Sequence, residues 1–219
     1  MNKVGRLMAA EFLVVYHEPG DPSESARVHT LVGQVRQLTG VDVETSTLKG
    51  FTGCRGCKRV YLLMFTRGGH WLSLREHGVD AVLVPPYVTA SAIVAELERR
   101  GLDHVLLVAL RAKRLVDEQL SDIEFIGRLV AAKGLSVEVR ILDGMRTAAR
   151  PETGAPVAPL ALLLGKLVRA ACSLTQGPCL GPLLHYGWWH ILAWLASDIR
   201  AQTQPHKTPR PIEHDGHGV

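Results

Sequence analysis

The chain has 219 residues, of which 47% are hydrophobic and 21% are charged, a composition typical of a globular protein and not of a disordered one. The formal net charge is +4 with ten histidines uncounted, which is too weakly basic to indicate nucleic-acid binding but suits a small polyanionic ligand. No apolar run reaches the ~18 residues that a membrane-spanning helix needs, so the sequence predicts no membrane span.

The first residues have a faint likeness to a secretion signal. Glu11 interrupts their apolar part and no small-residue cleavage site follows, which favours a first β-strand instead. Four cysteines in a chain of this size, without a secretory signal, favour reduced thiols and a cytoplasmic location.

Along the first hundred residues, short apolar runs typical of strands alternate with segments whose apolar residues have helical spacing. The helical pattern is clearest at Val28, Leu31, Val32 and Val35. The predicted elements, in chain order, are a strand at 12–16, a helix at 23–38, strands at 41–45 and 60–65, a short helix at 71–76, a strand at 81–84 and a helix at 90–100. Strands that alternate with helices predict parallel β-α-β units.

The same order starts again at residue 104, with a strand at 104–109 and a helix at 118–133. The segment "GLSVEVRILDG" (134–144) matches "GVDVETSTLKG" (40–50) in length and in both terminal glycines, and "PLALLLGKL" (159–167) takes the place of "LLMFTRGGH" (62–70). Residues 177–200 mirror 80–100 as an apolar run, a proline break and an amphipathic helix ending in arginine.

We therefore predict an α/β protein with two similar halves, each a mostly parallel four-stranded sheet flanked by helices. The first half spans residues 1–102 and the second spans 103–200. Residues 201–219 lose all periodicity and predict a disordered tail that contains histidine.

Two histidines follow predicted strands of the first half. His17 comes after "FLVVY", and His70 comes after "VYLLMFTRGG". Ligands of parallel sheets bind beyond the carboxyl ends of strands that lie ~5 Å apart, so the two imidazoles could converge on one cobalt, iron, nickel or zinc ion. Gly68 and Gly69 would let a flat ligand approach the backbone and would permit positive φ. The alternative is two loop-end histidines with no shared task.

The repeat favours a shared task for this pair. The position of His17 falls on Leu110 in the second half, and the position of His70 falls on Leu167. Both histidines are present in one half and both are absent from the other, as expected for residues that work together.

Three motifs in this order resemble the sirohydrochlorin chelatase family, the class II chelatases, in their long two-half form. "YHEPGDP" (16–22) is similar to the family's "GHGSRDP" and keeps the histidine, Asp21 and Pro22. "LLMFTRGGH" is similar to "PLFLxxGxH" and keeps Gly68 and His70 at the same spacing. "VLVPPYVTASAIVAELERR" and "PCLGPLLHYGWWHILAWLASDIR" both resemble the apolar strand ending in "PPLG" and the helix after it. The resemblance covers roughly residues 12–200.

The resemblance implies a cleft between the halves that holds a flat tetrapyrrole. It implies that His17 and His70 bind the incoming divalent ion and accept the pyrrole protons. The expected function is insertion of Co²⁺ or Fe²⁺, with Ni²⁺ also open, into sirohydrochlorin or a related tetrapyrrole of cobalamin or siroheme biosynthesis. We expect neither a nucleotide nor a nucleic-acid partner. The candidates to meet the substrate carboxylates are Arg67, Arg111, Lys113 and Arg114.

The site departs from the family pattern at several positions. Glu18-Pro19 replaces a "GS" pair, Lys49 stands where many members have an acid, and that acid is found at Asp143 in the second half. Glu18 is a candidate acidic metal ligand. The segment "LKGFTGCRGC" is short for the helix that members usually have there. A non-catalytic paralogue that binds tetrapyrrole or metal remains an alternative.

Cys54 and Cys57 form a C-x-x-C in a glycine-rich segment. With Cys172 and Cys179 they could complete a four-ligand zinc or iron–sulfur site, and some long chelatases carry such a cluster near a C-x-x-C. Free thiols and disulfides are the alternatives, and a thiol-based redox or regulatory protein is a further reading of the whole chain.

Aromatic and histidine residues near the carboxyl end carry two further expectations. Trp188, Trp189 and Trp194 of the last predicted helix would either pack in the core or stack on a macrocycle. The histidines of the tail, His206, His214 and His217, resemble the histidine-rich segments that family members use to hold metal.

Overall fold

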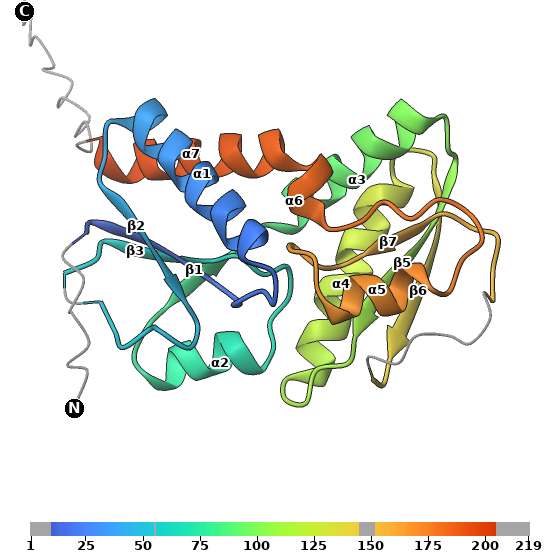
Figure 1. Ribbon diagram of the computed structural model, residues 1–219, viewed down its shortest axis with the longest axis horizontal. Helices are drawn as coiled ribbons and strands as arrows, with labels where there is room; N and C mark the ends of the chain where they lie inside the picture. Colours follow the sequence, from blue (N-terminus) through green and yellow to red (C-terminus); the bar gives the residue numbers. More distant parts are fainter. Residues whose placement is uncertain (1–9, 55, 145–151, 205–219) are drawn as a thin grey trace, which may run out of the picture.

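The computed structural model describes residues 10–54, 56–144 and 152–204 (Figure 1). The elements are β1 (Phe12–Tyr16), α1 (Pro22–Thr39), β2 (Val43–Thr47), β3 (Arg59–Leu62), α2 (Gly69–Glu76), β4 (Ala81–Leu83), α3 (Pro86–Arg100), β5 (His104–Leu110), α4 (Val116–Ala131), β6 (Ser136–Leu142), β7 (Val157–Pro159), α5 (Lys166–Cys172), α6 (Leu183–Tyr186) and α7 (Trp188–Thr203).

The strands form two parallel sheets, which confirms the predicted α/β class. The first sheet has the order β2-β1-β3-β4 and the second has the order β6-β5-β7. The second sheet therefore has three strands in the described residues, not the predicted four. The expected fourth strand is reduced to one bridge between Val157 and Cys179, because the flanking Pro178 and Pro182 have no N–H to extend a ladder.

The ends of several elements differ from the prediction for reasons of local chemistry. Helix α3 begins at Pro86, because a proline at the first helical position needs no hydrogen-bond partner for its nitrogen. Strand β3 ends at Leu62, because the N–H of Met64 turns back and donates to the carbonyl of Leu62 at 2.7 Å. Helix α7 runs to Thr203, so residues 201–203 of the predicted tail are helical, and the rest of that tail lies outside the described residues.

The internal repeat is visible in the register of the two sheets. Val15 pairs with Leu62 in the first sheet, and Val108 pairs with Pro159 in the second. Beyond these pairs, the N–H of Leu63 donates to the carbonyl of Val15 at 2.8 Å, and the N–H of Leu160 donates to that of Val108 at 2.7 Å. Segments 62–70 and 159–167 therefore hold equivalent places, as the sequence match predicts.

Helices cover both faces of each sheet, which explains why all five residues of β1 are buried. One face of the first sheet packs on α1 and α7, while Leu74 of α2 and residues around Phe51 cover the other. In the second sheet, α4 covers one face and α5 the other.

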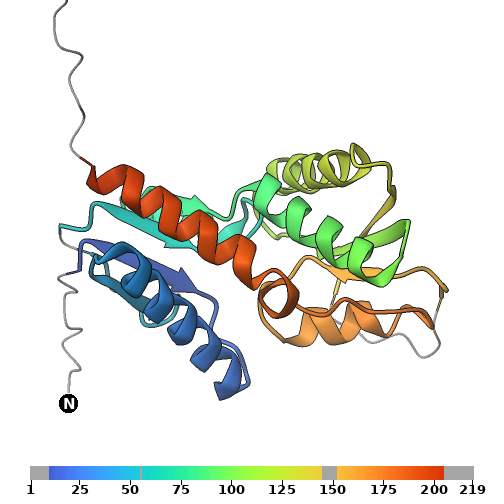
Figure 2. The same ribbon diagram turned by 90° about the horizontal axis from the view of Figure 1, so that it is seen from above.

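The last helix of each sequence half packs beside the first helix of the other half. Helix α7 lies along α1 above the first sheet, and α3 lies along α4 (Figure 2). The ring of Trp194 on α7 meets that of Tyr61 on β3 edge to face at 5.6 Å, and the Tyr61 hydroxyl donates to Asp198 at 2.7 Å. A division of the sequence at residue 102 therefore assigns α7 to the second half although it packs on the first sheet, and α3 to the first half although it packs beside α4.

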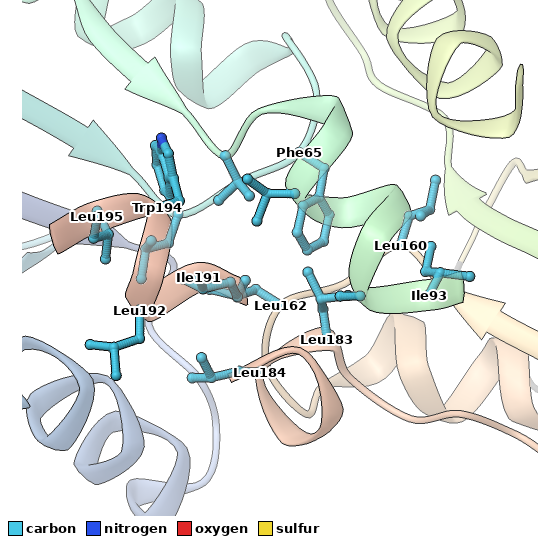
Figure 3. Close-up of a cluster of buried hydrophobic side chains, with 14 of the residues drawn as sticks. Phe65, Ile93, Leu160, Leu162, Leu183, Leu184, Ile191, Leu192, Trp194 and Leu195 are labelled. Atoms are coloured by element: carbon cyan, nitrogen blue, oxygen red, sulfur yellow. The ribbon is translucent and has the colours of Figure 1, made fainter. Parts of the chain in front are cut away.

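The exchanged helices cross at Gly187, where α6 turns into α7. A Cβ atom at this position would lie 2.8 Å from Cβ of Ala92 on α3 and 2.9 Å from the carbonyl oxygen of Leu183. Buried apolar side chains from both halves surround the crossing, among them Phe65, Leu162 and Ile191 (Figure 3). One continuous core therefore extends through both halves.

Among the residues that the structure describes, none belongs to a helix with the length and apolarity needed to cross a membrane.

Candidate metal site at the carboxyl edge of the first sheet

His17 and His70 lie together at the carboxyl edge of the first sheet. His17 directly follows β1, and His70 is the second residue of α2, which comes after the neighbouring parallel strand β3. The ring centroids are 5.3 Å apart and the ring planes meet at 65°. A metal–nitrogen distance of about 2 Å puts each ring centre roughly 3 Å from a bound ion, so two rings on one ion have centres roughly 5 Å apart. This spacing suits a shared ion.

The surroundings of the pair favour a neutral imidazole at His70 and one tautomer of His17. Nδ1 of His17 lies 3.0 Å from the carbonyl oxygen of Glu18, so a proton on Nδ1 is donated there and Nε2 keeps its lone pair. Partial desolvation, followed by the charge that His17 carries when protonated, lowers the pKa of His70. A neutral imidazole at His70 has a free lone pair, which can bind a metal ion or accept a proton.

The second half has the same backbone without the imidazoles. Gly68 precedes α2 with φ −172° and ψ −166°, and Gly165 precedes α5 with φ −164° and ψ −167°. Counting from these glycines, Leu167 takes the place of His70, and the register of β5 puts Leu110 in the place of His17. The donor pair is thus specific to the first half, although the turn that presents it is present twice.

The glycines of the first turn do not have the backbone that the sequence led us to expect. Neither Gly68 nor Gly69 has positive φ, so that expectation was wrong. Their role is spatial. A Cβ at Gly68 would touch Cβ of Ala112 in the second half at 3.7 Å, and one at Gly69 would meet nothing within 4 Å.

The described residues supply two imidazole donors and no third protein ligand. Within residues 10–54, 56–144 and 152–204, no group of three or more His, Cys, Asp or Glu side chains could hold a metal ion. The carboxylate of Glu18, which the sequence suggested as a ligand, instead lies 3.4 Å from Nζ of Lys49, and both side chains are exposed. An ion held by His17 and His70 would keep coordination positions free.

The candidate substrate-binding cations differ in how far they are already engaged. Arg67 pairs with Asp122, Arg111 with Asp143, and Arg114 with Glu76 at 2.5 Å. Lys113 lies in the same β5–α4 segment, is exposed, and has no ion pair with any residue in the described part of the chain. Of the four candidate cations, Lys113 is therefore the one without a carboxylate partner in the described part of the chain.

The four cysteines form two disulfides, Cys54–Cys57 and Cys172–Cys179. The first packs with Leu13 and Trp71 on the outer face of the first sheet, and the second lies beside β7 and α5 of the second sheet. The expectation of free thiols and that of one four-cysteine metal or cluster site both differ from this arrangement. Sequence spacing could not settle the matter, because the two pairs attach to different sheets.

The tryptophans do not gather at the histidine pair. Trp194 is buried in the core, and the indole N–H of Trp188 donates to Gln34 on α1 at 3.0 Å. Trp189 is 70% exposed. The packing alternative therefore holds for Trp188 and Trp194. The tail histidines lie outside the described residues.

Two residues near the site carried no signal in the sequence. Gln119 of α4 accepts from the N–H of Ala112 at 2.7 Å and donates to the carbonyl of Leu110 at 2.9 Å, which fixes the segment bearing Lys113. Asp122, one turn further along α4, holds Arg67. Both are ordinary polar residues in an amphipathic helix, and only the packing of α4 reveals their contacts.

No family model matches the chain, and no curated protein matches it. Solved structures do. The structure of CbiX, the terminal enzyme for biosynthesis of siroheme in denitrifying bacteria, has a TM-score of 0.57 and 21% identity, covering 87% of this chain and 98% of that chain. SirB from Bacillus subtilis with Fe³⁺ has a TM-score of 0.56 and 12% identity, covering 87% of this chain and 94% of that one.

The chain has the sirohydrochlorin chelatase fold. The sirohydrochlorin chelatase SirB from Bacillus subtilis subspecies spizizenii, solved in complex with cobalt, has a TM-score of 0.52 and 13% identity and covers 87% of this chain and 97% of that chain. The matches extend over nearly the whole length of the three chelatases, so the fold is shared through both halves and not through one sheet alone.

Proposed function

We propose that the protein is a chelatase that inserts divalent cobalt or iron into sirohydrochlorin or a closely related tetrapyrrole. The observation that carries the proposal is the pair His17 and His70, whose rings lie 5.3 Å apart at the carboxyl edge of the first sheet. The likeness in fold to the sirohydrochlorin chelatase SirB supports the choice of metal, because the SirB structures are solved with Fe³⁺ and with cobalt.

Insertion requires a metal ion that is held weakly and can be given up. Two imidazoles hold a divalent ion while leaving positions for water and for the pyrrole nitrogens. Because no third protein donor lies near the pair in the described residues, the ion can pass to the four nitrogens of the macrocycle without breaking a carboxylate or thiolate bond.

Insertion also releases two pyrrole protons, and the histidine pair supplies a base for them. The lowered pKa of His70 keeps its imidazole neutral at pH 7, so it accepts one pyrrole proton once the metal has left it, and Nε2 of His17 accepts the other. Since an imidazole bound to metal cannot take a proton at the same time, we assign metal holding first and proton acceptance second. The exposed Lys113 would meet a peripheral carboxylate of the macrocycle.

Two features of the sequence remain compatible with a protein that binds tetrapyrrole or metal without insertion. Lys49 pairs with Glu18 where many chelatases have an acid, and Arg111 pairs with Asp143 at the equivalent edge of the second sheet. This second candidate predicts metal binding without turnover.

The test is a spectroscopic assay of Co²⁺ or Fe²⁺ insertion into sirohydrochlorin by the wild type, His17→Ala and His70→Ala. We expect each substitution to lower the insertion rate by about a hundredfold or more, because each removes a metal ligand or the base. His104→Ala, at the start of β5 in the second sheet, is the matched histidine control and should leave the rate unchanged. Equal rates in all four proteins would refute the site, and metal binding without turnover in the wild type would favour the second candidate.

A further inference from the structure

The turn that carries His70 is held by a carboxylate from the other half. Asp122 on α4 accepts the backbone N–H of Arg67 at 2.7 Å, and it also accepts from the Arg67 guanidinium at 2.6 Å. The side chain of Asp122 is 16% exposed, so this contact is largely shielded from water. Arg67 lies three residues before His70.

The equivalent turn of the second half is held in the same way by the first half. Leu164 takes the place of Arg67, and its N–H donates to the Glu24 carboxylate on α1 at 2.8 Å. Nε2 of His185 lies 2.8 Å from the same carboxylate. In each half, a helix carboxylate therefore accepts one backbone N–H from the β–α turn of the other half. Only the turn bound by Asp122 carries a histidine.

The backbone between Arg67 and His70 needs such a restraint. It consists of Gly68 and Gly69, which have no side chains to limit rotation. Helix α2 begins there without a side-chain cap on its first N–H groups. A bond to the Arg67 N–H fixes the backbone itself, whereas a bond to its side chain alone would not.

Helix α4 braces both segments that face the site. One turn before Asp122, Gln119 holds Ala112, and Ala112 lies next to Gly68. Movement of α4 relative to the first sheet would therefore displace the turn of His70 and the segment of Lys113 together.

We propose that Asp122 is a positioning residue of the metal site: it holds the Arg67 backbone so that His70 points toward His17. The inference rests on the proposed function, since it assigns the pair to one shared ion. Displacing a reacting group by 1 Å can cost a hundredfold in rate, and a residue outside the ligands typically changes metal affinity by about ten- to hundredfold.

The test measures Co²⁺ affinity by titration of the visible spectrum, and kcat and KM for insertion, in three variants. Asp122→Ala removes every contact and should weaken Co²⁺ binding about tenfold and lower kcat, with a smaller change in the KM for sirohydrochlorin. Asp122→Asn keeps an acceptor for the Arg67 N–H and should recover part of that loss. Arg67→Ala keeps the backbone contact and should lose less than Asp122→Ala.

His185→Ala is the matched control, because it removes the side-chain partner of Glu24 and leaves the contact between Glu24 and the Leu164 N–H in place. It should bind Co²⁺ as the wild type does. Wild-type Co²⁺ affinity and kcat in both Asp122 variants would overturn the inference, as would an equal loss in His185→Ala, which would indicate general loosening between halves. Failure of the proposed function has a different result: His17→Ala and His70→Ala would then bind Co²⁺ like the wild type.

Discussion

The imidazole of His70 has two causes for its lowered pKa, and they can be separated. The larger is partial desolvation and the smaller is the charge of His17. In His17→Ala only desolvation remains, so we expect the pKa of His70 to rise while staying below the ordinary value of about 6.5. His70 would then be protonated at higher pH than in the wild type. An NMR titration of the imidazole, assigned with His70→Ala, measures this, and an unchanged curve would show that the rings do not interact.

The outcome matters for metal binding because protons and metal compete for the same nitrogen. Lowering the pKa of His70 extends the pH range in which its lone pair is free. The closeness of the two rings therefore has two effects: it lets both rings reach one ion, and it adds to the desolvation that disfavours protonation of His70.

At the scale of elements, the close contact of Gly187 with α3 predicts that an added methyl group lowers the stability of the protein, whereas the same change at Gly33 should raise it. Gly187→Ala would place a Cβ 2.8 Å from Cβ of Ala92 and 2.9 Å from the carbonyl oxygen of Leu183. We expect a loss of about 1–3 kcal/mol in the free energy of unfolding, measured by urea denaturation. Adding Ala92→Gly should restore part of the loss.

Gly33 lies inside α1, where an added Cβ would meet nothing within 4 Å. Gly33→Ala should therefore stabilise the protein by about 0.5–1 kcal/mol. A similar effect of both substitutions would show that helix propensity and not the close crossing governs Gly187.

Local patterns could predict most elements but not how they combine. The apolar run of β1 predicts Phe12–Tyr16 correctly, because a strand buried on both faces needs continuous apolar residues. The sequence places the start of α3 four residues late, because a proline pair can end a strand as well as begin a helix. The exchange of α3 and α7 was not predictable, because the same amphipathic pattern serves either neighbour.

The candidate site divides in the same way. The sequence predicted that His17 and His70 could converge, because the carboxyl ends of parallel strands meet at one edge of a sheet and the second half lacks both histidines. It missed Asp122 and Glu24, which each accept a backbone N–H from the other half, a contact that no side-chain pattern marks. It also misjudged the cysteines, since spacing alone does not distinguish a ligand pair from a disulfide.

At the scale of the whole molecule, the exchanged helices and the shared core predict one cooperative unfolding transition. Trp194 of the last helix packs on Tyr61 of the first sheet, and Glu24 of the first helix holds Leu164 of the second half. Neither half can therefore lose its structure without uncovering the core of the other. Tryptophan fluorescence, which reports the first sheet, and the amide NMR signals of β5 should change at the same urea concentration. Two separate midpoints would contradict this prediction.

Glu24→Ala tests how far the contacts of Glu24 with Leu164 and His185 make the two halves unfold together. Glu24 is 2% exposed, and its removal leaves the Leu164 N–H and His185 without their acceptor. Loss of a buried acceptor of this kind costs about 2–4 kcal/mol, so both probes should shift together to lower urea. Glu24→Gln keeps one acceptor oxygen and should lose less. An unfolding midpoint that moves for the β5 signals alone would mean that Glu24 stabilises only the second sheet and that the halves unfold independently.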